Sequence, residues 1–313
     1  MTPDIDIRGL GVSFETSRGP VYAVRELSTT FRAGRISGVI GESGSGKSVM
    51  GMSLLRLLPN TAKVTGECWF GDRELCTLPL RELRKLRGAS IGLIPQNPSA
   101  SLDPVMKLKR QITEAITAHG KLPRRDAERQ AAALLRRFGF EDAEDILNRY
   151  AFQMSGGMNQ RLVSALGLAC QPGWIIADEP TKGLDAVLRN QVYSVLREIY
   201  TRHHSSMIVI THDLYLARQL YDDICVLYMG QIVEQGSVEE VMERPRHPYT
   251  EGLIHSLPSR GMEPIPAPDP RKLEHFGCPF YPRCPKAIPR CAREVPGGYE
   301  LPTGGKVRCF LYA

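Results

Sequence analysis

Eight consecutive residues of this 313-residue chain have types and spacing suited to binding phosphate. They have the form G-x-x-x-x-G-K-[ST], in which glycines let the backbone curl until its N–H groups and a helix N-terminus point at anionic oxygens. Lys47 is expected to reach the β- and γ-phosphates of a nucleotide, and Ser48 to hold Mg²⁺. The plain alternative is a glycine-rich turn with a surface lysine. The expected nucleotide-binding residues are Gly41, Glu42, Ser43, Gly44, Ser45, Gly46, Lys47, Ser48 and Val49.

This loop needs a strand before it and a helix after it, and the sequence predicts both. The apolar run Ile36–Ile40 predicts the strand, and Val49–Leu58 predicts the helix. A second apolar strand, Trp174–Ala177, leads into Asp178 and Glu179, and ligands bind at the carboxyl ends of strands in open α/β sheets. We therefore expect Asp178 to organise Mg²⁺ and Glu179 to polarise an attacking water, the alternative being two acids that cap the following turn.

Periodicity outlines the rest of the chain. Alternating apolar residues in 4–40 predict strands and turns, and 66–73 predicts a strand with a hairpin turn. Apolar residues at helical spacing predict a helical insertion over 105–150. Phe14 or Tyr22 could stack on a nucleotide base, and either could equally be a core residue. Further expected elements are a basic helix at 81–87, strands at 91–94, 206–211 and 224–228, and helices at 162–170 and 186–201.

Two other positions could contact phosphate. Ser155-Gly156-Gly157 precedes a predicted helix and could form an anion site, although a plain helix N-cap is the favoured interpretation of that pattern alone. His212 follows a predicted strand, where it could reach a γ-phosphate or serve only in the structure.

Composition narrows the functional classes. The net charge of +6 is mild and scattered, so we expect no nucleic-acid partner. No apolar run of about 18 residues and no signal-peptide pattern in 1–11 are present, so we expect the chain neither to span a membrane nor to be exported. Half of the eight cysteines crowd the C-terminal tail, which in a reducing compartment favours metal binding over disulfides.

Taken together, these residues resemble the nucleotide-binding subunits of ABC transporters, from about Ile5 to the end of the chain. Gly41–Ser48 matches Walker A, and Asp178-Glu179 matches Walker B. The other matching positions are Gln96 of the Q-loop, Ser155, Gly156 and Gly157 of the signature, Asp185 of the D-loop and His212 of the switch.

The resemblance implies a P-loop NTPase fold of the α/β class with a mixed sheet core, an antiparallel β subdomain and a helical subdomain at about 105–165. A nucleotide-binding domain would span 1–240, and a small cysteine-rich extension 241–313. It also implies an ATPase whose two subunits pack head to tail, so that each ATP lies between the P-loop of one and the signature of the other. The expected catalytic residues are Glu179, His212, Gln96 and Lys47, and the expected Mg²⁺ ligands are Ser48, Gln96 and Asp178.

A finer resemblance is to the oligopeptide/dipeptide permease branch. It rests on Gly41–Val49, Met158, 246–250 and the tail 277–285. It implies a peripheral subunit on the cytoplasmic face of the inner membrane, with two transmembrane permease subunits, a second related ATPase subunit and, indirectly, an extracytoplasmic solute-binding protein. Importers of nickel, metal chelates, opines or glutathione use close relatives. A subunit of a phosphonate-degrading complex and a non-transport assembly or repair factor are alternatives of another class.

Two departures from the family's pattern concern the geometry of the signature and of the D-loop. Met154 and Met158 flank the signature where leucine and glutamine are commoner, and Lys182-Gly183 precedes the D-loop where small or hydroxyl residues are commoner. We expect the site built on this chain's own Walker motifs to hydrolyse ATP, because its motif residues are all intact: Lys47, Gln96, Glu179 and His212.

The clustered cysteines are separated by five, six and seventeen residues, spacings that fit tetrahedral zinc poorly. Four thiolates can hold a [4Fe–4S] cluster, although the spacing is not a common ferredoxin pattern. Zinc, an iron–sulfur cluster and cysteines without metal all remain open on the residues alone. The resemblance to the permease branch favours [4Fe–4S] held by Cys278, Cys284, Cys291 and Cys309.

Overall fold

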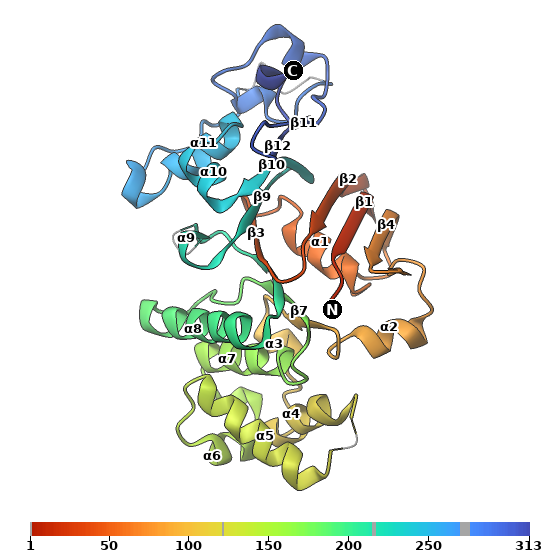
Figure 1. The fold of residues 1–313 in the computed structure, drawn as a ribbon, viewed down its shortest axis with the longest axis vertical. Helices are drawn as coiled ribbons and strands as arrows, with labels where there is room; N and C mark the ends of the chain where they lie inside the picture. Colours follow the sequence, from red (N-terminus) through yellow and green to blue (C-terminus); the bar gives the residue numbers. More distant parts are fainter. Residues whose placement is uncertain (1, 121, 215–216, 270–275) are drawn as a thin grey trace. The chain divides into compact units, whose positions relative to one another are not determined.

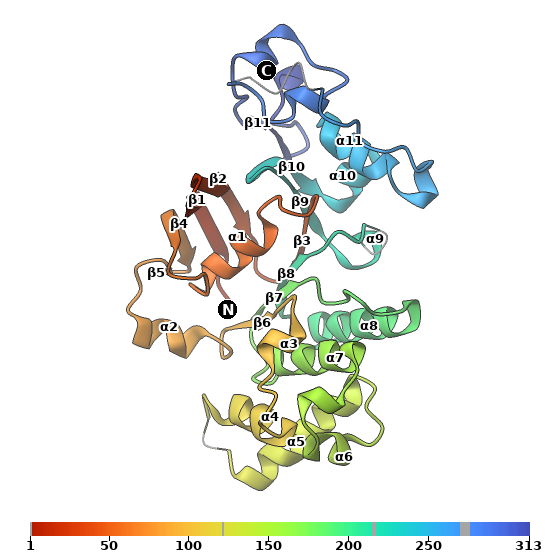
Figure 2. The same ribbon diagram turned by 180° about the vertical axis from the view of Figure 1, so that it is seen from behind.

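The structure is a computed structural model that describes residues 2–120, 122–214, 217–269 and 276–313. The chain folds into two units, whose elements are drawn in Figures 1 and 2. The P-loop unit consists of Ile5–Phe31, Ile36–Cys76 and Ile210–Ala313. The signature unit consists of Met1–Asp4, Arg32–Arg35 and Thr77–Val209.

The P-loop unit contains a four-stranded antiparallel sheet in the order β2-β1-β4-β5. Every second residue at the start of β1, such as Ile5 and Ile7, is fully buried, as expected of a sheet with one face on the core. This sheet confirms the predicted antiparallel β region. Its strands are β1 (Ile5–Thr16), β2 (Gly19–Phe31), β4 (Ala62–Phe70) and β5 (Arg73–Glu74).

A second set of strands in this unit is mixed. Strand β3 pairs with β9 in parallel, while β9, β10, β12 and β11 follow one another as antiparallel neighbours. All five residues of β3 are buried, as in a strand covered on both faces. The strands are β3 (Ile36–Ile40), β9 (Asp223–Tyr228), β10 (Gln231–Ser237), β11 (Tyr299–Glu300) and β12 (Lys306–Val307).

Short helices complete the P-loop unit. Helix α1 ends at Leu54, four residues before the predicted end, because Arg56 adopts a left-handed backbone (φ 49°) and the N–H of Leu57 donates to the carbonyl of Met52 at 3.0 Å. The helices are α1 (Lys47–Leu54), α9 (Ala217–Leu220), α10 (Val238–Glu243) and α11 (Pro248–His255), with 3₁₀ turns at Pro258–Arg260, Tyr281–Arg283, Pro289–Ala292 and Phe310–Tyr312.

The signature unit has its own strands. Strand β6 (Ile91–Ile94) pairs in parallel with β7 (Trp174–Asp178), so that Ile94 lies opposite Ala177, and β8 (Ser206–Ile210) lies on the other side of β7. All three were predicted from their apolar runs.

Helices make up the rest of the signature unit. Helices α4, α5 and α6 pack on one another and lie together in both views, which confirms the predicted helical insertion. The helices are α2 (Leu80–Leu86), α3 (Pro98–Ser101), α4 (Leu108–Thr117), α5 (Arg124–Arg137), α6 (Ala143–Asn148), α7 (Gly156–Gly167) and α8 (Ala186–His203), with a 3₁₀ turn at Ala151–Gln153. Among the described residues, no helix is both long enough and apolar enough to cross a membrane.

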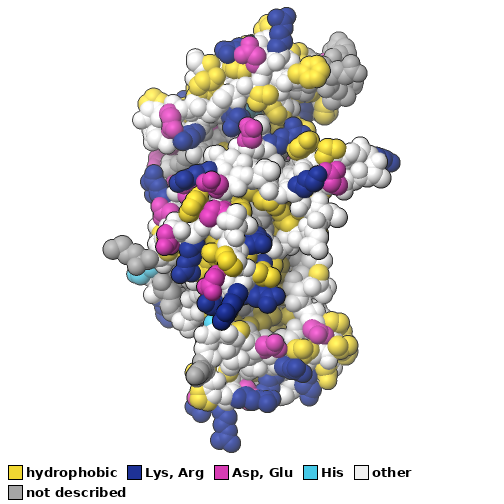
Figure 3. All heavy atoms as spheres, turned by 90° about the vertical axis from the view of Figure 1, so that its right-hand side faces the viewer, with side chains coloured by type: hydrophobic (Ala, Val, Ile, Leu, Met, Phe, Trp, Pro, Cys, Tyr) yellow, Lys and Arg dark blue, Asp and Glu magenta, His cyan; other side chains and the backbone are white. Residues whose placement is uncertain are grey.

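The surface charge is mixed. On the face drawn in Figure 3, Lys and Arg side chains are interspersed with Asp and Glu. No single-sign patch covers that face.

Candidate nucleotide site

The loop between β3 and α1 is strained by any residue other than glycine at two positions. Gly41 (φ 148°) and Gly46 (φ 101°) have backbone conformations that other residues rarely adopt. A Cβ atom would lie 2.2 Å from the carbonyl oxygen of Leu227 at Gly41, and 2.3 Å from that of Ala23 at Gly46. The loop is thus wedged between the backbone of β2 and that of β9.

The polar groups of this loop point inward. Lys47 is buried, and its Nζ donates to the carbonyl oxygens of Gly41 at 2.8 Å and Glu42 at 2.9 Å. The hydroxyl of Ser45 is also buried and has no hydrogen-bond partner within the described part of the chain. A buried cation and a spare hydroxyl at the N-terminus of α1 are groups that an anionic ligand would satisfy.

His212 lies in the same unit. The N–H of Thr211 donates to the carbonyl of Val39 at 3.1 Å, which brings the residue after β8 alongside the end of β3. His212 is exposed and directly follows Thr211, whose partner Val39 lies two residues before the first glycine of the P-loop.

In the signature unit, the Walker B carboxylates end strand β7. Asp178 and Glu179 are both buried, and Glu179 adopts a left-handed backbone (φ 49°) that is uncommon for a residue with a side chain. The pairing of β6 with β7 brings Gln96, two residues beyond β6 and exposed, to the same edge of the sheet as Asp178.

The signature residues begin helix α7. The Oγ of Ser155 accepts the N–H of Met158 at 3.2 Å, so Ser155 is the N-cap, and α7 starts at Gly156 rather than at the predicted Leu162. Serine capping extends the helix across two glycines that propensity alone would exclude. Ser155 and Gly156 are exposed, and a Cβ at Gly156 would meet nothing within 4 Å.

The D-loop lies beside the signature. A Cβ at Gly157 would lie 3.2 Å from Cδ2 of Leu184, and Asp185 caps α8 by accepting the N–H of Leu188 at 2.9 Å. The structure therefore brings together the signature and the D-loop within one unit.

The two candidate base-stacking aromatics lie on paired strands. Phe14 on β1 is half-buried, whereas Tyr22 on β2 is 56% exposed, with the guanidinium of Arg25 5.8 Å from its ring centre. Tyr22 also precedes Ala23, whose carbonyl contacts the P-loop at Gly46.

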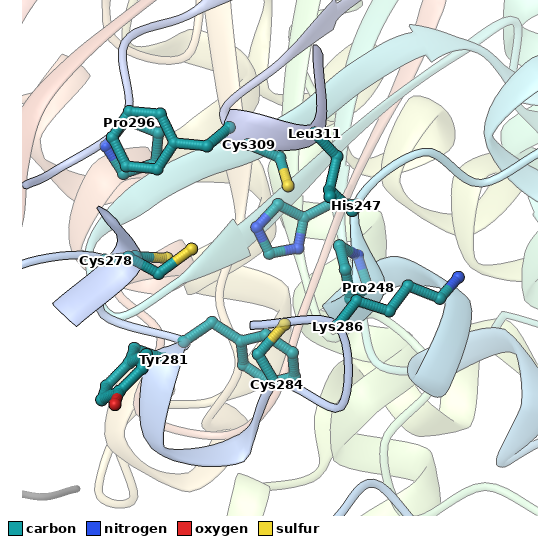
Figure 4. Close-up of a pocket in the computed structure, with 12 residues that line it drawn as sticks. His247, Pro248, Cys278, Tyr281, Cys284, Lys286, Pro296, Cys309 and Leu311 are labelled. Carbon is teal, nitrogen blue, oxygen red and sulfur yellow. The ribbon is translucent and has the colours of Figure 1, made fainter. Parts of the chain in front are cut away.

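The four C-terminal cysteines line one pocket of the P-loop unit. Figure 4 shows Cys278, Cys284 and Cys309 around this pocket, and Cys291 lines it too. Burial raises the pKa of Cys278 and of Cys284 to about 11 and that of Cys309 above its usual value. Within the described ranges, no group of three or more His, Cys, Asp or Glu side chains could hold a metal ion, so the expected iron–sulfur site is not confirmed.

Sequence reasoning missed His247, which lines the same pocket. Its Nδ1 accepts the N–H of Tyr249 at 3.0 Å, and its backbone N–H donates to Glu234 at 2.8 Å. Desolvation lowers the pKa of His247 to about 3, so this imidazole is neutral at pH 7. The sequence marked His247 only as part of the 246–250 motif of the permease resemblance, with nothing to place it beside the cysteines.

Comparison with known proteins decides the family. Residues 24–182 match the family model described as ABC transporter. The chain belongs to this family. As an ABC ATPase it has the P-loop fold with a mixed sheet, and it hydrolyses ATP, as members of this family do. Residues 233–291 match a second model, described as oligopeptide/dipeptide transporter, C-terminal region.

Relatives match the ABC ATPase over nearly its whole length. The dipeptide transport ATP-binding protein DppD of Bacillus subtilis is 38% identical over 98% of this chain and 94% of the relative. The oligopeptide transport ATP-binding protein OppD of Escherichia coli is 36% identical over 98% of this chain and 92% of the relative.

A solved structure titled as a dimeric structure of MJ0796, a bacterial ABC transporter cassette, shares the fold. It superimposes with a TM-score of 0.68 at 25% identity, covering 75% of this chain and 98% of that one.

Proposed function

We propose that this ABC ATPase energises the import of oligopeptides, dipeptides or a related small solute. The relatives named above are dipeptide and oligopeptide transport ATP-binding proteins, and the C-terminal region matches a model of the same transporters. We place it on the cytoplasmic face of the membrane, with two permease subunits, a second ATPase subunit and a solute-binding protein that supplies the cargo.

The observation that carries the nucleotide part of this proposal is the geometry of the P-loop. The left-handed glycines, buried Lys47 and unsatisfied Ser45 hydroxyl provide donors for phosphate oxygens. Lys47 would exchange the carbonyl oxygens of Gly41 and Glu42 for the β- and γ-phosphates. Tyr22 is our choice for stacking on adenine, since its ring is exposed and its neighbour Ala23 contacts the loop.

For hydrolysis, we assign each role to a residue of this chain. Ser48, Gln96 and Asp178 would hold Mg²⁺, which neutralises charge on the β- and γ-phosphates. Glu179 would accept a proton from the attacking water, and His212 would hold the γ-phosphate in line. Lys47 would stabilise the negative charge that develops on the transferred phosphoryl group.

The exposed signature points to a shared site. Ser155 and Gly156 are open to an approaching surface, so they would donate to an ATP held by the partner ATPase subunit. Closure would then depend on the γ-phosphate, and hydrolysis would release the pair. We expect the partner to be a related but different chain.

We further propose a [4Fe–4S] cluster in the cysteine pocket, bound by Cys278, Cys284, Cys291 and Cys309. A cluster of this type takes one thiolate per iron, so its four ligands surround a shared space and need not converge on one ion. The four thiols around one pocket fit that demand. A bound cluster would order an extension of short turns, and its test is iron and sulfide content after anaerobic purification. Iron-free protein would exclude it.

Transport in proteoliposomes tests the main proposal. The assembled transporter, with its permease and solute-binding protein, should couple uptake of a labelled peptide to ATP hydrolysis. Glu179→Gln should bind ATP and lose hydrolysis, and Lys47→Ala should lose binding. Uptake of a nickel chelate or opine in place of peptide would show that the substrate belongs to one of those classes. ATPase activity without any permease partner would argue against a role in transport.

A further inference from the structure

One residue of the P-loop is held by the C-terminal extension. The carboxylate of Glu42 accepts two hydrogen bonds from the guanidinium of Arg283, at 2.8 and 2.9 Å. The backbone N–H of Glu42 donates to the hydroxyl of Tyr249 at 2.8 Å. Both partners are more than 200 residues away in sequence and belong to the same unit as the loop.

Contacts other than the pair with Glu42 also hold the side chain of Arg283 in place. Its side chain is only 15% exposed, its Nε donates to the carbonyl of Pro266 at 2.9 Å, and its guanidinium lies 5.9 Å from the ring centres of both Tyr228 and Phe280. The hydrogen bonds to Glu42 raise its pKa further above the usual value. A planar guanidinium held in this way makes a bidentate pair of defined direction, unlike a mobile surface ion pair.

Three aromatic rings form the base of this contact. Tyr228 and Tyr249 lie 4.6 Å apart between ring centres, and Phe280 meets them edge-on at 5.3 and 5.5 Å. Phe280 also lines the cysteine pocket. The cluster therefore connects the extension to the P-loop through the hydroxyl of Tyr249, which accepts the N–H of Glu42.

The extension holds the residue whose backbone carbonyl accepts a hydrogen bond from Lys47. The carbonyl oxygen of Glu42 accepts both the Nζ of Lys47 at 2.9 Å and the N–H of Ser45 at 3.2 Å. The N–H of Glu42, which Tyr249 holds, shares a peptide plane with the carbonyl of Gly41, the other acceptor of Lys47 Nζ at 2.8 Å. Because Arg283 also holds the Glu42 carboxylate, the extension restrains the loop backbone next to both acceptors of Lys47. A loop held in its binding conformation loses less entropy when the ligand arrives. Arg283 also compensates a carboxylate that would otherwise repel a nucleotide triphosphate.

We propose that Arg283 and Tyr249 are positioning residues for ATP, which fix the P-loop through Glu42 and make nucleotide affinity depend on the C-terminal extension. This rests on the proposal that Gly41–Ser48 binds the phosphates of ATP.

The test is the affinity of the full chain, within the assembled transporter, for a fluorescent ATP analogue with Mg²⁺, measured beside the KM and kcat of hydrolysis. Arg283→Ala should raise Kd and KM about 10-fold while kcat changes less than about twofold, as expected for a lost charge-assisted pair that preorganises binding. Tyr249→Phe removes only the hydroxyl and should raise Kd about threefold. Arg283→Lys keeps the positive charge but loses the two-nitrogen guanidinium geometry, so its Kd should lie between those of wild type and Arg283→Ala.

A matched control and a double variant separate this role from general stabilisation. Arg260 also pairs with a carboxylate in the same unit, donating from Nη2 to both oxygens of Glu243, so Arg260→Ala should leave Kd unchanged. Glu42→Gln combined with Arg283→Ala should bind no more weakly than Arg283→Ala alone, because both changes break one pair. Melting temperature checks that each variant is folded, and Arg283→Lys and Tyr249→Phe serve if Arg283→Ala does not fold.

Each outcome has a defined meaning. Wild-type Kd in folded Arg283→Ala, or in both Arg283→Lys and Tyr249→Phe, overturns the inference. Strictly additive losses in the double variant also overturn it. Lys47→Ala tests the underlying proposal separately: if it binds the analogue as wild type does, the assignment of the P-loop fails, whereas loss in Lys47→Ala with no effect of Arg283→Ala refutes only the positioning role.

Discussion

Substituting Gly46 and Gly44 separately by alanine would test the packing of the P-loop most directly. Both residues have a left-handed backbone, φ 101° at Gly46 and φ 80° at Gly44, so alanine is strained at either position. The surroundings differ. A Cβ at Gly44 would meet nothing within 4 Å, whereas at Gly46 it would lie 2.3 Å from the carbonyl oxygen of Ala23.

The magnitude follows from that difference. Placing alanine in a left-handed conformation costs about 1–2 kcal/mol, which is the loss of unfolding free energy expected for Gly44→Ala. At Gly46 the new Cβ would also have to displace the backbone of β2. The same Cβ would lie 3.5 Å from the Cα of Gly230. Overpacking against backbone adds about 1–3 kcal/mol, so we expect a total loss of about 2–5 kcal/mol for Gly46→Ala, larger than that for Gly44→Ala.

Urea unfolding without nucleotide, followed by fluorescence, measures both losses without relying on activity. Gly34→Ala is the control outside the loop, since Gly34 has φ 72° and nothing within 4 Å of its missing Cβ. It should match Gly44→Ala. An unfolding free energy for Gly46→Ala equal to that of Gly44→Ala would refute the close approach of the loop to β2.

Three further predictions concern the other motifs. Glu179→Gln should retain binding of the ATP analogue and reduce the hydrolysis rate at least about 100-fold, as expected on loss of a general base; hydrolysis at the wild-type rate in the heterodimer would contradict that role. Asp185→Ala removes the N-cap of α8 and should lower the unfolding free energy by about 1 kcal/mol in a urea titration, whereas Asp185→Asn should lose less because its side-chain oxygen can still accept the Leu188 N–H. Cys284→Ser should lower the iron content of anaerobically purified protein relative to Cys170→Ser, since Cys170 lies outside the cysteine pocket; equal iron in the two variants would exclude Cys284 as a ligand.

The cysteine pocket shows how chain separation limits sequence reasoning. The cysteines at 278, 284 and 291 are close in sequence, whereas Cys309 is 18 residues further on and follows strand β12, which pairs with β10. His247 enters the same pocket from the start of α11. The crowding of cysteines predicted a site, and the 246–250 motif marked His247, but nothing in the sequence placed His247 beside the cysteines.

What the sequence determined by itself was local. Walker A, the β7 carboxylates and the signature are each read from a few adjacent residues, because glycine conformation, strand burial and helix capping act over short distances. Helix ends depend on capping as well as on apolar spacing. The Ser155 cap starts α7 at Gly156, six residues before the apolar run that predicted the helix.

Only the tertiary structure could join Glu42 to Arg283 and Tyr249. These contacts depend on α11 and the turn at Tyr281–Arg283 packing beside the P-loop, and no periodicity or spacing encodes a pair 241 residues apart. The strength of such a pair comes from the half-buried, fork-shaped geometry that the fold imposes on Arg283. The chemistry of the P-loop was thus legible in its residues, while its support by the C-terminal extension was a property of the folded chain.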